Sequence, residues 1–379
     1  MTGNLIRGGL LLLSAALLPA CGSGSPGDGE TSGLLLLTAT SPTTAFVTTP
    51  VGVQHSVVPI HFTLTSVQSA SVLVAVLFSE DGGATFRRAT PAYGIGSLSA
   101  RASSPSGVAH TFLWNSLDDG VGAGSVVLGG FTSLGTVNPR VRVRVVPDAG
   151  TEGMTADFAV DNTMNRFIGT VTTAFPHSFS TVGVSETAEG DLVADAMRLR
   201  YGAQLAFQNG WGLREPLPTA FGPAETSLRR PLDGYAAGPP FDLVFGDVAL
   251  TLPFGNRVVT RTVTGAQLWA VLEQGVSSYP ANNNGFPQIS GFRFTFKAGN
   301  PSGSRVLSVT LDGGAPISKD ATVYTFATND FVNGGGDFYE MLNDGQGIVR
   351  ELLMQVVADR IEALSPATPS LAGRITVVP

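Results

Sequence analysis

Residues 329–337 read Asn329-Asp330-Phe331-Val332-Asn333-Gly334-Gly335-Gly336-Asp337. Glycines let a backbone approach a ligand closely, and here they stand between an aromatic and an acidic side chain that could touch it. Further stretches of this kind precede it, in the order Gln208-Asn209-Gly210-Trp211-Gly212-Leu213-Arg214, Pro253-Phe254-Gly255-Asn256 and Gly285-Phe286-Pro287-Gln288-Ile289-Ser290-Gly291. The later half of the chain therefore predicts a domain with a small-molecule site built from several loops.

The composition of the whole chain is typical of an exported, β-rich protein. Its 379 residues are enough for two ordinary domains and a processed N-terminus. Hydrophobic residues make up 43% and charged residues only 13%, with 47 glycines and 24 prolines. The formal net charge of −7 argues against a nonspecific nucleic-acid partner and against an anionic-membrane surface.

The N-terminus predicts a lipoprotein signal. Arg7 precedes an apolar run over 10–18 that is too short to span a bilayer as a helix. The run ends in Leu18-Pro19-Ala20-Cys21, which resembles a bacterial lipobox. We expect a signal peptide over 1–20, a lipid on Cys21 and a flexible tether over 21–33. The alternative is an ordinary cleaved signal with an incidental cysteine. The first interpretation predicts export and a lipid anchor in the bacterial cell envelope, on the periplasmic side or at the cell surface.

Residues 34–163 predict an Ig-like β-sandwich that acts as a spacer or an adhesive arm. Apolar and polar residues alternate over 55–66 and 71–78, and further strands fit 110–114, 140–146 and 158–160. Because Cys21 is the only cysteine, no disulfide supports the Ig-like assignment, and the resemblance is one of architecture. Residues 79–86 resemble an Asp-box, in which an aspartate and a threonine tie down a β-turn, so the predicted role of Asp81 is structural. Alternate arginines over 140–144 favour a solvated sheet face over an anion site.

Residues 164–379 predict an α+β domain, which makes the fold class multidomain: an all-β sandwich followed by mixed α and β. Helical patterns cover 190–200, the stretch opened by the capping-box spacing of Thr264 and Gln267, and 346–364. Strands fit the ranges 204–208, 248–252, 257–263, 292–296, 306–311, 323–327 and 374–378. Residues 215–242 are rich in Pro, Ala and Gly and predict an inserted surface loop.

The four glycine-containing stretches, in this order, resemble the C-terminal, substrate-binding domain of the 5'-nucleotidase family. The resemblance implies an aromatic sandwich around a base, formed by Phe254 and Phe331. It implies that Asp337 binds the ribose hydroxyls and that Asn256 contacts the edge of the base. It also implies a backbone contact from Gly285 near the base, and a phosphate contact from Arg214. Structural alternatives exist for each of these residues, from core aromatics to turn-forming side chains.

The chain departs from the family pattern at the phosphate end. Residues 179–185 carry no Lys or Arg where the family places further basic residues, so nucleosides become as plausible as nucleotides. Arg229 and Arg230, in the inserted loop, are candidates to replace those charges. Trp211 and Phe338 stand where the family usually has glycine, and a tryptophan at 211 could either add a stacking wall or fill the pocket.

The sequence predicts no catalytic residue, metal site or cofactor. Metal-dependent phosphoesterases need several His, Asp and Asn ligands, and the signatures Asp-x-His, Gly-Asp-x-x-Asp, Gly-Asn-His and Gly-His-x-His do not occur. Only four histidines are present, at positions 55, 61, 110 and 177, and they form no ligand-like cluster in the sequence.

Three functional hypotheses remain open. The chain could be a noncatalytic surface lipoprotein that binds a nucleoside or nucleotide. It could be the substrate-binding part of a split nucleotide hydrolase that works with a separate metallophosphatase chain. It could instead be a structural or adhesive protein whose pocket is closed, which Trp211 between the two phenylalanines would favour.

Overall fold

The computed structural model describes residues 42–92, 96–127 and 129–378. The predicted signal peptide, the lipidation site Cys21 and the tether lie outside these residues. Within them, no helix is long and apolar enough to span a bilayer.

The residues up to 160 form strands that pair into sheets. One sheet has the order β10-β1-β2-β6, and another has the order β11-β9-β3-β4, with β12 on β9 and β5 on β3. These elements are β1 (Thr43–Val47), β2 (Val57–Ser66), β3 (Ala70–Ser79), β4 (Arg87–Arg88), β5 (Leu98–Ser103), β6 (Val108–Asn115), β7 (Ser125–Val127), β8 (Gly130–Ser133), β9 (Asn138–Pro147), β10 (Gly150–Thr151), β11 (Gly153–Met154) and β12 (Phe158–Val160). Alternate side chains of β2, β3 and β9 are buried together in one core, as expected for stacked sheets. The Ig-like class itself, and the boundary at residue 163, stay predictions.

The Asp-box resemblance corresponds to a hydrogen-bonded turn after β3. The Asp81 carboxylate accepts from the backbone N–H groups of Ala84 and Thr85, both at 2.9 Å, and from the hydroxyl of Thr85 at 2.6 Å. The Ser79 hydroxyl also donates to it, and these hydrogen bonds lower the pKa of Asp81. The contacts of Asp81 are therefore those of a turn-forming residue.

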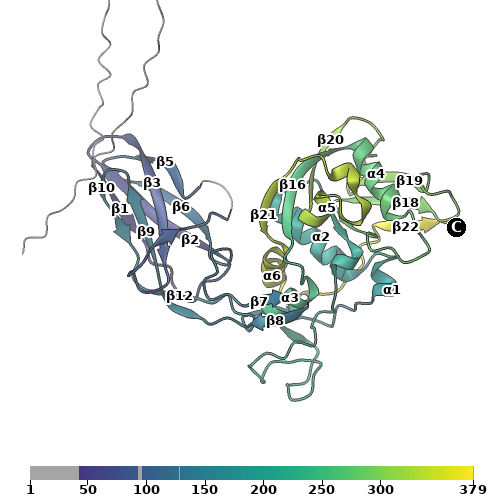
Figure 1. Cartoon of the computed structure of the whole chain (residues 1–379), viewed down its shortest axis with the longest axis horizontal. Helices are drawn as coiled ribbons and strands as arrows, with labels where there is room; N and C mark the ends of the chain where they lie inside the picture. The colour runs from purple at the N-terminus through teal and green to yellow at the C-terminus, as the bar shows by residue number, and fades with distance from the viewer. Residues whose placement is uncertain (1–41, 93–95, 128, 379) are drawn as a thin grey trace, which may run out of the picture. The chain divides into compact units, whose positions relative to one another are not determined.

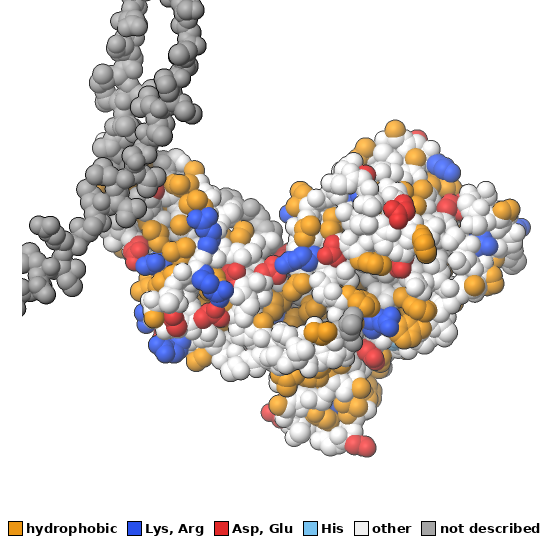
Figure 2. Space-filling view, viewed as in Figure 1, with side chains coloured by type: hydrophobic (Ala, Val, Ile, Leu, Met, Phe, Trp, Pro, Cys, Tyr) orange, Lys and Arg blue, Asp and Glu red, His pale blue; other side chains and the backbone are white. Residues whose placement is uncertain are grey.

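The arginines of β9 lie among acidic side chains. Arg142 pairs with Asp157, and Arg144 pairs with Glu152 at 3.3 Å. Figure 2 shows blue and red side chains interspersed on this part of the surface. Arg140 donates instead to the backbone carbonyl of Asp81 at 3.1 Å. A sheet face on which Arg142 and Arg144 have acidic partners fits the solvated-face interpretation better than an anion site.

The residues from 167 onward form an α+β unit. Its elements are β13 (Phe167–Val171), α1 (Phe179–Val182), α2 (Ala188–Tyr201), β14 (Leu205–Asn209), β15 (Phe241–Val244), α3 (Phe245–Thr251), β16 (Arg257–Thr264), α4 (Gly265–Gly275), β17 (Pro287–Ser290), β18 (Phe292–Lys297), β19 (Val306–Leu311), β20 (Val323–Asn329), α5 (Asp330–Asn333), β21 (Ile348–Leu352), α6 (Leu353–Leu364) and β22 (Ile375–Val378). The main sheet has the order β17-β14-β20-β16-β21, and a smaller one has the order β19-β18-β22. Helix α2 packs on β17, β14 and β20, while α4 packs on β16 and β19. Figure 1 shows α4 beside β19.

Two sequence predictions are wrong here. The apolar run 248–252 was predicted as a strand, but residues 248–251 belong to helix α3 and Leu252 caps its end. The Asp247 carboxylate accepts from the N–H of Val244 at 2.9 Å and fixes the first turn of this helix. The predicted helix over 346–364 begins only at Leu353, because residues 348–352 pair with β16 as strand β21. Short apolar runs fit either structure, so tertiary pairing decides between them.

The predicted capping box is confirmed at α4. The Gln267 N–H donates to the Thr264 hydroxyl at 3.1 Å, and the Gln267 side chain accepts from the Thr264 N–H at 3.0 Å. This reciprocal pair fixes where β16 ends and α4 begins.

Candidate functional site

The four glycine-containing stretches meet at one edge of the main sheet. Strands β14 and β20 are parallel neighbours, so the stretches that follow them, from Asn209 and from Asn329, leave the sheet at the same end. Strands β17 and β16 run antiparallel to these two, so the stretches that precede them arrive at that same end. Topology therefore brings together segments that are up to about 130 residues apart in the sequence, since Asn209 and Asp337 differ by 128 positions.

A cavity of about 360 Å³ opens among these stretches. Its volume lies within the range of small-molecule sites. The cavity is lined by Asn209, Trp211, Gly212, Arg214, Phe254, Asn256, Asn284, Phe331 and Asp337. Of the predicted site residues, the structure thus gathers Arg214, Phe254, Asn256, Phe331 and Asp337 in one place.

The two phenylalanines present accessible rings to this cavity. Phe254 is 48% exposed and Phe331 is 47% exposed, so neither is a core aromatic. The ring of Phe331 lies against Gly336, where an added Cβ would come within 2.5 Å of the ring. A glycine is therefore required at 336 for this ring position.

Trp211 forms a wall of the cavity. Its ring packs on Phe179, with the ring centroids 5.3 Å apart. Trp211, Phe254 and Phe331 all line the cavity, which keeps a volume of about 360 Å³. Trp211 packs on Phe179 at the wall and does not fill the cavity, so the structure does not support the closed-pocket hypothesis.

Asp337 is held by a chain of amides that the sequence analysis did not single out. Asn209 donates from Nδ2 to the Asp337 carboxylate at 2.8 Å. The oxygen of Asn209 is already engaged, because Asn329 donates to it at 2.9 Å and Gln208 at 3.1 Å. The nitrogen of Asn209 must therefore face Asp337. The signal was present in the sequence, since both asparagines belong to the quoted stretches, but their pairing is a tertiary property.

The backbone at Asp337 is unusual. Asp337 and Phe338 have φ of +52° and +66°, the left-handed region that side chains other than glycine rarely adopt. Each such residue costs on the order of 1–3 kcal/mol and persists only where its surroundings determine it. Burial raises the pKa of the Asp337 carboxyl, and the hydrogen bond from Asn209 opposes this change.

Gly285 lies behind Asp337 and does not line the cavity. Its N–H donates to the side chain of Asn283 at 3.0 Å, and its carbonyl accepts from the hydroxyl of Tyr339. The neighbouring residue Asn284 lines the cavity in its place. A backbone contact from Gly285 to a base stays a prediction.

Arg214 is the basic side chain of the described lining. Its guanidinium carbon lies 4.5 Å from the ring centroid of Phe179 and 5.6 Å from that of Phe254. Stacking of this kind holds the guanidinium plane while leaving its N–H donors available. Within the described part of the chain, no protein acceptor is bonded to these donors.

The inserted loop does not supply the missing positive charges. Arg230 is fully buried in an ion pair with Asp247, at 2.6 Å. Arg229 pairs with Asp242 at 2.5 Å. The suggestion that these arginines replace phosphate-binding residues is therefore wrong, because both guanidiniums already pair with carboxylates of this chain.

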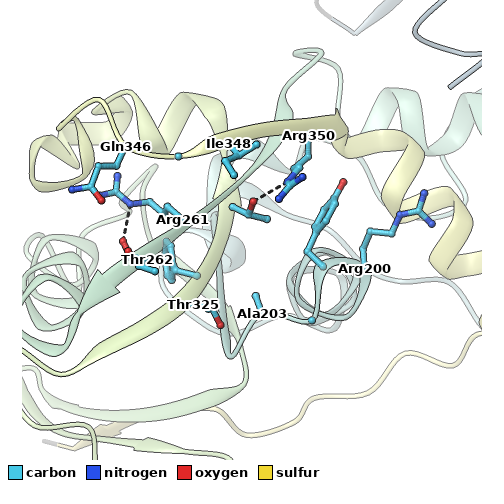
Figure 3. A pocket seen from close by; sticks show the side chains of 13 residues that line it. Arg200, Ala203, Arg261, Thr262, Thr325, Gln346, Ile348 and Arg350 are labelled. Carbon is cyan, nitrogen blue, oxygen red and sulfur yellow. Dashed lines mark hydrogen bonds between the residues drawn. The ribbon is translucent and has the colours of Figure 1, made fainter. Parts of the chain in front are cut away.

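A larger cavity of about 720 Å³ lies elsewhere, beside strands β16 and β21 (Figure 3). It is lined by Arg200, Arg261 and Arg350 together with threonines, and none of the predicted site residues is among its lining. Arg261 is bonded to Asp344 at 2.6 Å, and Arg350 donates to Thr260 at 2.8 Å. The smaller cavity is the candidate site, because aromatic and polar groups converge on it.

One group of metal-capable side chains occurs among the described residues. Atoms of His55, Asp359 and Glu362 lie within 4.8 Å of one another. Both carboxylates already have cationic partners, since Glu362 pairs with Arg166 and Asp359 with Arg200 at 3.4 Å. The group is accounted for by these ion pairs, and we assign no metal to it.

Behind the cavity lies a buried pair formed by His177 and Glu189. The His177 Nδ1 and a Glu189 oxygen are 3.0 Å apart, and their side chains are 5% and 1% exposed. His177 packs edge-on against Phe179, the ring beneath Arg214. Burial raises the pKa of Glu189 to about 7, and the hydrogen bond with His177 opposes this rise.

The raised pKa predicts a pH dependence of stability. Between about 4.5 and about 7, the unfolded chain releases the Glu189 proton while the folded chain retains it, so rising pH lowers stability through this group. A Glu189→Gln variant lacks this effect. Its melting temperature relative to the wild type should rise from pH 4 to pH 7 and then level off. A difference that does not change with pH would contradict the assignment.

Comparison with known proteins identifies relatives of the α+β part. Residues 167–344 match the family model described as 5'-nucleotidase, C-terminal domain. The chain is 28% identical over 233 residues to the trifunctional nucleotide phosphoesterase protein YfkN of Bacillus subtilis, covering 58% of this chain and 14% of that protein. It is 30% identical over 159 residues to the cell wall protein Lmo0130 of Listeria monocytogenes, covering 40% of this chain and 18% of that protein.

Among solved structures, the chain is similar to a 5'-nucleotidase precursor from Thermus thermophilus. The TM-score is 0.49 at 24% identity, over 64% of this chain and 50% of that one. The chain spans less than a fifth of the length of the two curated relatives named above.

Proposed function

Because residues 167–344 form a domain of the 5'-nucleotidase C-terminal family, we propose that this chain binds a nucleoside or nucleotide between Phe254 and Phe331. The observation that carries the proposal is the open cavity of about 360 Å³, lined by both rings and by Asp337. Aromatic faces suit any flat base, and stacking contributes roughly 1–3 kcal/mol per base.

The polar groups of the cavity support this ligand class. Asp337 is fixed through one oxygen by Asn209, which leaves its other oxygen for a ribose hydroxyl. Asn256 lies beside Phe254 and provides an amide for the edge of the base. A nucleoside presents these features together: a flat face, a polar edge and a pair of hydroxyls.

The phosphate end has one basic side chain among the lining residues, so we expect it to separate nucleosides from nucleotides only weakly. Arg214 is the basic residue of the lining, and it is flanked by the aromatic rings of Phe179 and Phe254. A single guanidinium can hold two phosphate oxygens. We expect adenosine and AMP to bind with affinities of the same order.

We propose that the chain by itself is noncatalytic. It lacks the histidine-containing signatures of metal-dependent phosphoesterases. The second candidate is the substrate-binding part of a split hydrolase that works with a separate metallophosphatase. The similarity to part of a nucleotide phosphoesterase, of which this chain covers 14%, favours that candidate. Anchoring through a lipid on Cys21, at the surface of a bacterial envelope, remains part of the proposal.

The experiment is isothermal titration of the chain from Gly22 onward with adenosine, AMP, ribose and inorganic phosphate. We expect binding of adenosine and AMP. Absence of binding by a sample that melts cooperatively would contradict the proposal and leave the structural or adhesive hypothesis. Release of phosphate from AMP by the purified chain would contradict the noncatalytic assignment.

An Asp337→Ala variant should bind adenosine more weakly by about 1–3 kcal/mol, roughly 5- to 150-fold, because it loses the acceptor for the ribose hydroxyls. Binding of the free base adenine should change little, since adenine has no ribose. Full adenosine affinity in this variant would remove the ribose-binding role from Asp337.

A further inference from the structure

We propose that Asp330 sets the base preference of this cavity by fixing the amide of Asn256, so that 6-aminopurine nucleosides bind better than 6-oxopurine nucleosides. The inference rests on the proposed function. It assigns Asp330 as a positioning residue, because it acts on the ligand only through Asn256.

A hydrogen bond between Asn256 and Asp330 joins the segments that carry Phe254 and Phe331. Asn256 donates from Nδ2 to Asp330 Oδ1 at 2.8 Å, across 74 positions of the sequence. Asp330 immediately precedes Phe331 in helix α5, and Asn256 follows Phe254 by two positions. The hydrogen bond therefore ties together the segments that carry the two stacking rings, at the edge where a bound base would lie.

The chemistry of the pair decides which way the amide points. An ionised carboxylate only accepts hydrogen bonds, whereas an amide has a donor end and an acceptor end. The nitrogen of Asn256 must therefore face Asp330, and a donor bonded to a charged acceptor is held more strongly than one bonded to a neutral acceptor. Within the described part of the chain, no side chain or backbone group donates to the Asn256 side-chain oxygen. This oxygen is left as an acceptor for the ligand.

An acceptor at the base edge discriminates between purines. Adenine carries an amino group at position 6, which can donate to the Asn256 oxygen. Hypoxanthine and guanine carry an oxygen at position 6 and a proton on N1. An Asn256 oxygen that faces position 6 would therefore meet a second acceptor, and both would be left unpaired. We expect adenosine to bind roughly tenfold more tightly than inosine, which differs from it by an oxygen in place of the amino group and by a proton on N1.

The test is titration of the chain from Gly22 onward with adenosine and with inosine, in the wild type and in Asp330→Asn. Asparagine at 330 can donate as well as accept, so the Asn256 amide is free to turn its nitrogen toward the base. The ratio of the two dissociation constants should fall from about ten to about three or less. Asp312→Asn is the matched control, because Asp312 pairs with Arg293 at 3.6 Å and does not line the cavity; it should keep the wild-type ratio.

A second variant covers the case in which Asp330→Asn does not fold. Asn256→Ala removes the acceptor itself, so adenosine affinity should fall more than inosine affinity and the ratio should approach one. A loss of affinity that is equal for both nucleosides in these variants would indicate a merely structural role and overturn the inference.

Two wild-type outcomes separate this inference from the proposed function. Equal binding of adenosine and inosine overturns the base preference and leaves nucleoside binding in place. Binding of neither nucleoside by a cooperatively melting sample overturns both.

Discussion

An Arg230→Ala variant is expected to lose about 3–5 kcal/mol of its free energy of unfolding, because it leaves a buried carboxylate without its counter-charge. Both oxygens of Asp247 accept from Arg230, at 2.6 and 2.7 Å, and both side chains are fully buried. Arg230 also donates to the carbonyls of Thr219 and Phe221, at 3.2 and 2.8 Å. The guanidinium therefore holds the inserted loop against helix α3, and its removal should loosen both.

The adjacent residue supplies the matched control. Arg229 lies on the same loop and pairs with Asp242, but its side chain is 38% exposed. In Arg229→Ala the mostly buried Asp242 carboxylate keeps its hydrogen bond from the N–H of residue 229, at 2.8 Å, so this variant should lose much less stability than Arg230→Ala. The measurement is the urea concentration at the midpoint of unfolding for each variant. This midpoint reports stability when the dependence of the unfolding free energy on urea concentration is the same as in the wild type. Equal midpoints for the two variants would show that the loop does not depend on the buried pair.

A Phe254→Ala/Phe331→Ala double variant is expected to lose roughly 2–6 kcal/mol of adenosine binding, because each ring contributes roughly 1–3 kcal/mol of stacking. This corresponds to a dissociation constant at least about 30-fold higher. Both rings are about half exposed, at 48% and 47%, so their truncation opens no deep core cavity and the fold should persist. Titration calorimetry gives the affinity, and the melting temperature reports folding.

Phe338→Ala is the control for this variant. Phe338 belongs to the same glycine-rich loop, is 78% exposed and does not line the cavity. Its truncation should leave adenosine affinity close to that of the wild type. If the double variant binds as the wild type does, the base does not lie between the two rings.

The sequence predicted best those elements whose determining residues lie close together in the chain. The capping-box spacing of Thr264 and Gln267 placed the start of α4, because both partners lie within one helical turn. The strand predicted over 248–252 is wrong, because a short apolar segment fits a strand or a helix equally well. The predicted helix over 346–364 begins too early because residues 348–352 pair with β16, about 90 positions earlier, as Thr260 does with Ile348.

The candidate site shows the same division. Phe254, Asn256, Phe331, Asp337 and Arg214 were predicted from the order of their motifs, and the structure gathers them around one cavity. Arg230 was a candidate to replace missing phosphate-binding charges, but it is buried in an ion pair with Asp247. The composition of residues 215–242, rich in Pro, Ala and Gly, gives no sign of this burial.

The sequence by itself determined which types of side chain the glycine-containing stretches carry, because aromatic, amide and charged residues beside glycines can be recognised locally. Only the tertiary structure decided how these side chains are oriented. Asn209 and Asp337 are 128 positions apart, and Asn256 and Asp330 are 74 apart, so each hydrogen bond exists only after the strands have paired. The direction of an amide is set by its partner, and strand pairing in the folded sheet provides that partner.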